Sequence, residues 1–264
     1  MAVTILQRGA ITALDYRCDA RPGDKPFAEL HASMSVSYVR SGTFGYHSRG
    51  KCYELVAGSL LIGNAGDEFT CTHEFAHGDE CLSFHFAPDV AEEVAKAPFW
   101  KIGSLPPMAQ TAAFGEAAQA AAQQDTAIAL DEAALLLAQR AGTIVSGGTH
   151  ISRTSARDRR RAIEAALWID ASCGENIDLR AAARPSGLSP FHFLRVFTRV
   201  VGVTPHQYLI RARLRKAARL LAVSGRPVTE IALECGFNDI ANFTRSFRRA
   251  AGRSPLAFRN FCKA

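Results

Sequence analysis

The sequence lacks the features by which membrane and secreted proteins are usually recognised. Its longest uninterrupted apolar run covers residues 133–138, far short of the roughly 20 residues that cross a bilayer as a helix. Residues 1–17 show no basic segment followed by an apolar one, so no secretory signal is expected. The seven cysteines are odd in number and scattered, which argues against a disulfide framework. We therefore expect a cytoplasmic protein with no membrane partner.

The chain does contain enough apolar residues for more than one core. It has 264 residues, of which 48% are hydrophobic and 21% are charged. This composition excludes a disordered polyelectrolyte, and the length suits two ordinary domains better than one.

The net charge of +6 is divided unevenly between the two halves of the chain. Residues 1–150 contain 10 Lys and Arg against 17 Asp and Glu, a net −7, whereas residues 151–264 contain 21 against 8, a net +13. Such asymmetry favours a C-terminal half that meets a polyanion, with nucleic acid as the leading candidate. A solvated basic face on an ordinary domain remains the alternative on charge alone.

Hydrophobic patterning indicates strands first and helices afterwards. In the first hundred residues, short apolar segments at 36–39, 60–62 and 81–86 alternate with glycines, which is typical of a sandwich or small barrel. Residues 108–124 and 128–145 have helical spacing. The second of these helices is expected either to pack on the β domain or to pair with its twin in another subunit. The polar segment 147–157 is expected to be a linker.

The C-terminal half contains an internal repeat with an offset of about 50 residues. The residues that recur 50 positions later are Phe193, Arg195, Phe197, Gly202 and Pro205. Tyr208 corresponds to Phe258 at the same offset. Upstream, Leu179, Ala182 and Ala183 match Val228, Ile231 and Ala232 at an offset of 49. The second copy therefore has one extra residue between its turn and its second helix.

Each copy predicts a helix, a tight turn and a second helix. Gly187 and Gly236 can adopt the positive φ of a sharp turn. A capping residue follows, Ser189 before Pro190 and Asn238 before Asp239. Phenylalanines four residues apart bury one face of each second helix and leave an arginine-bearing face outward. This pattern is typical of a helix-turn-helix.

A connecting helix is predicted over Leu209–Ala222, with an apolar stripe along one side and Arg211, Arg215 and Arg219 beside it. A rigid helix of this kind would hold the two motifs at a fixed separation. Because major-groove faces recur every ~34–36 Å, one chain would then reach two successive grooves.

With these motifs the chain resembles the AraC/XylS family of bacterial transcription regulators over residues 160–260. The most specific stretch runs Ile231-Ala232…Gly236-Phe237…Phe243…Arg245…Phe247…Gly252…Ser254-Pro255…Phe258-Arg259. In the N-terminal half, Tyr53…Gly58…Leu60-Leu61-Ile62 resembles the family's cupin-like effector domain in pattern only.

The resemblance implies an α+β protein with three parts. Residues 1–146 would form a cupin-like effector and dimerisation domain, a β-barrel or sandwich with trailing helices. Residues 147–157 would form the linker, and residues 158–264 an all-α DNA-binding domain with two helix-turn-helix motifs. The implied partners are double-stranded DNA, a small-molecule effector of unknown identity, a second copy of the chain and RNA polymerase.

The resemblance also implies which residues contact DNA. These are Phe191, His192 and Arg195 in the first recognition helix, and Ile240, Asn242 and Arg245 in the second. Helical spacing adds Arg199 and Arg249 as DNA-contacting candidates, because they lie on the same outward faces. Arginine suits guanine through a bidentate contact, asparagine suits adenine, and Phe191 and Ile240 would touch thymine methyl groups. Core packing is the alternative for Ile240, and phosphate contact is the alternative for Arg195 and Arg245.

The first motif departs from the family's pattern at Pro185. Proline inside a helix removes a hydrogen bond and clashes with the preceding turn, at a cost of ~3 kcal/mol or more. Ala182 also stands where the family usually has a larger apolar residue. We expect the first helix of this motif to be short or kinked.

A segment of the N-terminal half concentrates metal-ligand residue types. If residues 71–85 form a hairpin that turns near His77, pairing 73 with 81 would bring several of these side chains together. The candidate ligands are Cys71, His73, His77 and Cys81, with His85 close by, and zinc or another borderline-soft metal would suit them. A Cys71/Cys81 redox switch and ordinary structural cysteines are the alternatives. No other cofactor is expected.

Three functions compete. The first is a transcriptional regulator, an activator or a repressor, whose acidic β domain senses a chemical signal and whose basic domain binds DNA. The second is a cupin-type metal-binding enzyme, or a metal or redox sensor, fused to a DNA-binding domain. The third is an architectural DNA-binding protein without a ligand. The sequence favours the first and no enzymatic activity.

Overall fold

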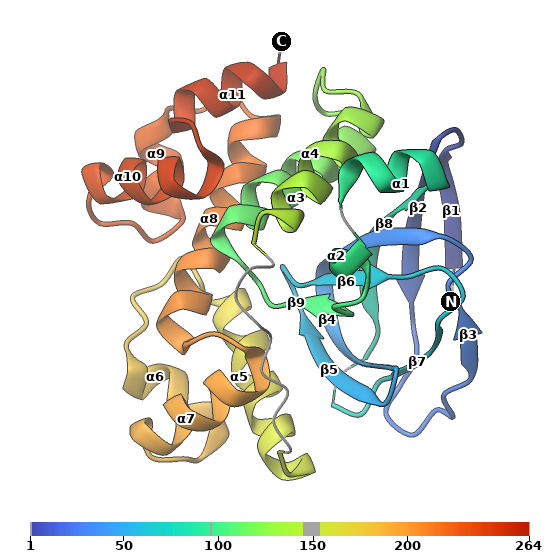
Figure 1. The fold of residues 1–264 in the computed structure, drawn as a ribbon. Helices are drawn as coiled ribbons and strands as arrows, with labels where there is room; N and C mark the ends of the chain where they lie inside the picture. Colours follow the sequence, from blue (N-terminus) through green and yellow to red (C-terminus); the bar gives the residue numbers. More distant parts are fainter. Residues whose placement is uncertain (1, 76, 96, 145–153, 264) are drawn as a thin grey trace.

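The computed structural model describes residues 2–75, 77–95, 97–144 and 154–263, and it has the predicted α+β composition, with a nine-stranded sheet followed by helices (Figure 1). The strands are β1 (Ala2–Gln7), β2 (Ile11–Cys18), β3 (Ala28–Leu30), β4 (Met34–Ser48), β5 (Lys51–Val56), β6 (Leu60–Gly63), β7 (Glu68–Thr72), β8 (Asp79–Phe86) and β9 (Ser104–Leu105). The three segments that the alternation of apolar runs and glycines predicted lie in β4, β6 and β8.

The long strand β4 joins two sets of strands. Its first half pairs with β6 and β8, and its second half pairs with β5 and β7. A β-bulge between Val39 and Ser41 precedes the change from β8 to β5, which falls between Gly42 and Thr43, and a bulge bends a strand and increases its twist. The inner faces enclose an aromatic cluster that includes Phe44, Tyr46 and Tyr53.

The helices of the N-terminal half are α1 (Pro88–Val94), α2 (Ala97–Trp100), α3 (Ala109–Ala122) and α4 (Leu130–Gly142). Those of the C-terminal half are α5 (Ala156–Ala171), α6 (Leu179–Ala183) with the 3-10 turn Arg184–Ser186, α7 (Pro190–Val201), α8 (Pro205–Val223), α9 (Val228–Glu234), α10 (Ile240–Ala251) and α11 (Pro255–Lys263). None of the helices in the described part of the chain is long and apolar enough to cross a membrane.

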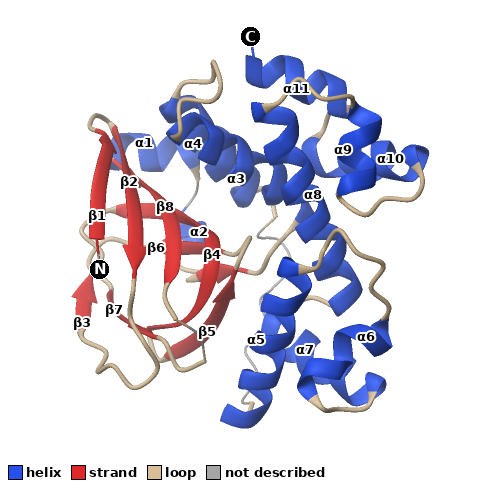
Figure 2. Cartoon of the chain, turned by 180° about the vertical axis from the view of Figure 1, so that it is seen from behind, coloured by secondary structure: helices blue, strands red, loops and turns tan. Residues whose placement is uncertain are grey.

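Helices α3 and α4 lie between the β-sheet and α8 (Figure 2). Helix α3 packs on α4, α8 and α10, and α4 also contacts α1 and β2. Leu137, Ala138 and Ala141 of α4 are buried in this layer, whereas its other leucines are only partly buried. Sequence alone left open whether the helix predicted over 128–145 packs on the β domain or pairs with its twin in another subunit, and the structure shows it packed within the chain.

The apolar cores do not follow the predicted domain boundary. One cluster runs from the sheet through α3 and α4 into α8, α9, α10 and α11, and a second joins α5, α6, α7 and part of α8. Residues 147–153 of the predicted linker lie outside the described residues. Ser155, which the prediction placed in the linker, caps α5 by accepting a hydrogen bond from the Asp158 amide at 3.1 Å.

Candidate nucleic-acid interface

The first helical pair, α6 and α7, lies at one end of α8 (Figure 1). Helix α6 gives way after Ala183 to the 3-10 turn that contains Pro185, because proline has no amide hydrogen to continue an α-helix. Gly187 then turns the chain with a φ of +64°. Ser189 caps α7 by accepting a hydrogen bond from the His192 amide at 3.4 Å. The expected short first helix and the expected cap are both confirmed.

The second pair, α9 and α10, lies at the other end of α8 and has the same plan. Gly236 turns the chain with a φ of +83°. The predicted cap, Asn238, is wrong. Asp239 caps α10 by accepting a hydrogen bond from the Ala241 amide at 2.9 Å. The extra residue in this turn moves the cap one position along the chain. Asp239 therefore stands 50 residues after Ser189, the same offset that separates the phenylalanines of the two copies.

The repeat builds the same aromatic cluster twice. In the first pair the Phe193 and Phe197 rings lie 5.4 Å apart, and Tyr208 contacts Phe197 edge-on at 5.7 Å. In the second pair the corresponding centroid distances are 5.6 Å from Phe243 to Phe247 and 5.3 Å from Phe247 to Phe258. Because all six rings are buried, each cluster fixes the rotation of its second helix about the helix axis.

That rotation turns the predicted DNA-contacting side chains outward. His192, Arg195, Arg199, Asn242, Arg245 and Arg249 are all exposed. Phe191 is 83% exposed, an unusual state for a large apolar ring at the start of a helix. Ile240 differs, because it is half-buried and packs against the apolar core. Its position supports core packing over contact with a thymine methyl group.

The described residues provide no partner for the outward arginines. Within the described ranges, no carboxylate or other acceptor pairs with the side chain of Arg195, Arg199, Arg245 or Arg249. Two separate helix faces thus each present at least two cations that no described residue pairs with. Arginine suits both phosphate and base edges, because its planar guanidinium donates several hydrogen bonds in a fixed geometry.

The three arginines of α8 that the sequence placed beside the apolar stripe are engaged within the protein. Arg211 donates to the Pro107 carbonyl, and burial lowers its pKa to about 10. Arg219 Nε lies 2.9 Å from Glu116 Oε2 in α3, and the Tyr38 hydroxyl donates to Oε1 of the same carboxylate at 2.8 Å. The Glu116 side chain is 1% exposed, and its two oxygens connect α3 to β4 and to α8.

Arg215 makes the central contact of this group. It is buried, pairs with Asp170 of α5, and lies with its guanidinium carbon 5.7 Å from the centre of the Tyr208 ring. The Tyr208 hydroxyl also donates to Asp170, at 2.5 Å. A Cβ on Gly58 would stand 2.5 Å from Arg215 Nη1, so the turn between β5 and β6 comes this close only because it has a glycine there.

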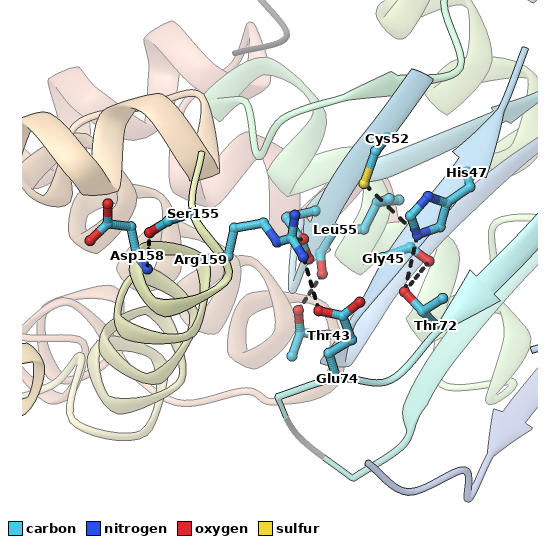
Figure 3. Close-up of polar contacts among 11 residues, drawn as sticks. Thr43, Gly45, His47, Cys52, Leu55, Thr72, Glu74, Ser155, Asp158 and Arg159 are labelled. Carbon is cyan, nitrogen blue, oxygen red and sulfur yellow. Dashed lines mark hydrogen bonds and ion pairs between the residues drawn. The ribbon is translucent and has the colours of Figure 1, made fainter. Parts of the chain in front are cut away.

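A second set of contacts joins α5 to the strands (Figure 3). Arg159 Nε lies 3.1 Å from Glu54 Oε1 in β5, and Arg159 Nη2 lies 2.9 Å from Glu74 Oε2. The guanidinium carbon is also 5.7 Å from the centre of the Phe75 ring. Burial raises the pKa of Glu54 to about 7, although the charge of Arg159 acts to lower it.

The predicted metal ligands are only partly brought together. The hairpin prediction is wrong, because β7 pairs with β3 and β4 whereas β8 pairs with β2 and β4. His77 is exposed, while Cys71 and Cys81 pack in the aromatic cluster of the sheet. His85 bonds with Ser33 Oγ at 2.9 Å and Ser83 Oγ at 3.1 Å.

His73 has different neighbours from those that the hairpin implied. In the described part of the chain, its ring nitrogen, the Cys18 thiol and an Asp79 carboxylate oxygen lie within 4.8 Å of one another. Cys18 is 55 residues from His73 in the sequence, and no local pattern could have connected them.

The two cysteines of the predicted redox switch are poorly suited to that role. Burial raises the pKa of the Cys71 and Cys81 thiols. This disfavours a redox switch, which needs a reactive thiolate.

A cavity of about 520 Å³ lies between the sheet and the helices that follow it. Its lining is mostly apolar, with a few polar side chains from β2, β8 and the β3–β4 loop, and includes Thr12, Ser33, Met34, His85, Phe86, Ala91 and Trp100. Ligand sites in proteins usually occupy about 300–1,000 Å³ with this kind of lining. The cavity is partly open to solvent, and its volume lies within the range of small-molecule sites.

Comparison with known proteins places the likeness in the C-terminal half. The family profile described as a helix-turn-helix domain matches residues 182–260. The chain is similar to the probable transcriptional regulator LumQ of Photobacterium leiognathi, with 31% identity over 96 residues that cover 36% of this chain and 39% of that protein. It is also similar to the HTH-type transcriptional activator RhaS of Escherichia coli O139:H28, with 38% identity over 92 residues that cover 35% of this chain and 33% of that protein.

Among solved structures, the DNA-binding domain of AdpA in complex with a target DNA is 34% identical. That match covers 38% of this chain and 91% of the AdpA chain, with a TM-score of 0.37. The chain thus matches less than half the length of the curated relatives, and the likeness concerns the two helical pairs and the helix that joins them.

Proposed function

Since residues 182–260 form a helix-turn-helix domain of the AraC/XylS type, we propose that the chain is a transcriptional regulator that binds double-stranded DNA through α7 and α10. The observation that carries this proposal is the pair of arginine faces. Each is held outward by a buried aromatic cluster, and the described residues offer its arginines no partner.

Both helices would contact DNA bases. Arg195 and Arg245 stand at the same place in the repeat and would contact guanine, while Asn242 would contact adenine and Phe191 a thymine methyl group. Arg199 and Arg249 lie one turn further along and would hold phosphate. Ile240 would act by packing the start of α10 onto the core and would not read a base.

The N-terminal domain would modulate this activity as a cupin-like sensing domain. It contacts the DNA-binding half through Glu116 with Arg219 and through Glu54 and Glu74 with Arg159. A ligand alters DNA binding only if it binds two arrangements of the domains with different affinity. The cavity of about 520 Å³ is our candidate site for a small-molecule effector. A second copy of the chain and RNA polymerase are the proposed protein partners.

Capture of fragmented genomic DNA by the full-length protein, followed by sequencing, tests the proposal. We expect a few sharp peaks, each with two half-sites about one helical turn apart. The Arg195→Ala/Arg245→Ala variant should lose the peaks. Arg17→Ala should keep them, because Arg17 is an exposed arginine on the β domain. Broad capture without peaks, or equal loss in both variants, would contradict sequence-specific binding through α7 and α10.

A further inference from the structure

The register of β2 and β8 brings three metal-ligand side chains to one end of the sheet. Cys18, the last residue of β2, is directly opposite Asp79, the first residue of β8. Side chains of directly opposed residues lie on the same face with their Cβ atoms about 4.5–5.5 Å apart. His73, just beyond the end of β7, places Nε2 2.7 Å from Asp79 Oδ1. The three potential ligand atoms all lie within 4.8 Å of one another.

The surroundings complete the set of donors. Cys81 follows Asp79 by two residues on the same face of β8, and its thiol donates to Asp79 Oδ2 at 3.3 Å. The side chains of His73 and Asp79 are 6% and 9% exposed, so water competes poorly for them. Cys18 is only half-buried, which leaves a path from solvent to its thiol.

We propose that Cys18, His73 and Asp79 form a binding site for a borderline-soft divalent metal ion of the zinc type, with Cys81 or water as the fourth ligand. Thiolate, imidazole and carboxylate are the ligands that zinc takes in four-coordinate sites. Bond lengths of 2.0–2.2 Å and a tetrahedral angle separate two such ligand atoms by about 3.4 Å. The ion would replace the hydrogen between His73 and Asp79, and their atoms would move apart from 2.7 Å. It would also displace the Cys18 proton.

The position of His73 connects this site to the DNA-binding half. The next two residues, Glu74 and Phe75, contact Arg159 of α5, and Phe75 also packs against the apolar core that contains α7. A shift of His73 toward an ion therefore moves the residues that touch α5. Metal occupancy would in this way change the affinity for DNA, a link that rests on the proposed function, whereas the metal site itself does not.

Titration of the reduced, metal-free, full-length protein with Co²⁺ tests the site directly. We expect one equivalent to bind, with the visible absorption of a four-coordinate cobalt ion and the near-ultraviolet band of a cobalt–thiolate bond. Cys18→Ser should lose at least about 10-fold in affinity. It should also lose the whole thiolate band if water is the fourth ligand, or about half of its intensity if Cys81 is. Cys52→Ser is the matched control, because Cys52 is also half-buried and lies beside a histidine, His47. Far-ultraviolet circular dichroism verifies that both variants fold.

Three results would overturn the site. One is the absence of stoichiometric cobalt binding. Another is a thiolate band that Cys18→Ser retains at full intensity. The third is an equal loss in Cys52→Ser. None of these would affect the proposed DNA binding, which metal-free protein can show on a captured site.

Fluorescence anisotropy on a captured DNA site, with and without Zn²⁺, tests the link to DNA. We expect Zn²⁺ to change the DNA affinity of the wild type. Glu74→Gln should bind cobalt like the wild type but respond less to Zn²⁺ in the DNA assay, because it lacks the charge that pairs with Arg159. Metal binding without any effect on DNA affinity would overturn the link and leave the site standing. Metal binding by a protein that captures no specific DNA would overturn the proposed function and not the site.

Discussion

The contact between Arg219 and Glu116 allows a quantitative test of how the two halves are held together. Glu116 is buried with its side chain 1% exposed, whereas the side chain of Arg219 is 54% exposed. Removing one partner of a fully buried pair costs about 3–5 kcal/mol, and a hydrogen bond to a charged group contributes about 1.5–3 kcal/mol. Because solvent screens the arginine, the lower range applies. We expect Arg219→Met to lower the free energy of unfolding by about 2 kcal/mol.

Urea unfolding followed by circular dichroism measures this loss. Arg226→Met is the matched control, because Arg226 pairs with Glu230 and Glu234, which are themselves solvent-accessible, and its loss should be clearly smaller. A double-mutant cycle with Tyr38→Phe should give a coupling energy, since both side chains bond to the one carboxylate of Glu116. Equal losses in Arg219→Met and Arg226→Met would refute the claim that Glu116 depends on Arg219 across the interface.

Three further predictions concern the DNA contact, the pH dependence and the turn of the second pair. Arg245→Ala should cost about 1–3 kcal/mol of binding free energy on the cognate site and relax one base preference, and an equal loss on random DNA, measured by anisotropy, would show a phosphate contact instead. Burial raises the pKa of Glu54 from 4.5 to about 7, so the folded state holds this proton more tightly. Protonated Glu54 therefore stabilises the folded state fully below pH 4.5, and this stabilisation is lost as the pH rises to about 7. The free energy of unfolding should fall by up to about 3 kcal/mol over this range. Glu54→Gln should remove this slope in urea unfolding at a series of pH values, and an unchanged slope would assign it to other groups. Gly236→Ala should lower the free energy of unfolding by about 1–2 kcal/mol, because φ is +83° and a Cβ would lie 2.9 Å from the Gly174 carbonyl oxygen. Gly225→Ala, where a Cβ meets no atom within 4 Å, should change little, and similar losses in the two variants would contradict this account.

The sequence alone was sufficient wherever the signal is local. Caps, turns and apolar faces depend on residues within a few positions of one another, so the roles of Ser189, Gly187 and Gly236 follow from their immediate neighbours in the chain. The repeat with its offset of 50 likewise predicted the buried phenylalanines and the outward arginines, since both follow from helical periodicity. The same reasoning was wrong at Asn238, because one inserted residue shifts a cap without changing the composition of the turn.

Only the tertiary structure decided the contacts between segments far apart in the chain. Periodicity placed Arg215 and Arg219 beside an apolar stripe, but their partners Asp170 and Glu116 come from other helices. Cys18 meets Asp79 because β2 pairs with β8 in one particular register, and strand register is set by the burial of whole faces. The sequence by itself therefore determined two helical pairs that suit DNA. The pairing of distant strands and helices decided which side chains connect those pairs to a candidate metal site.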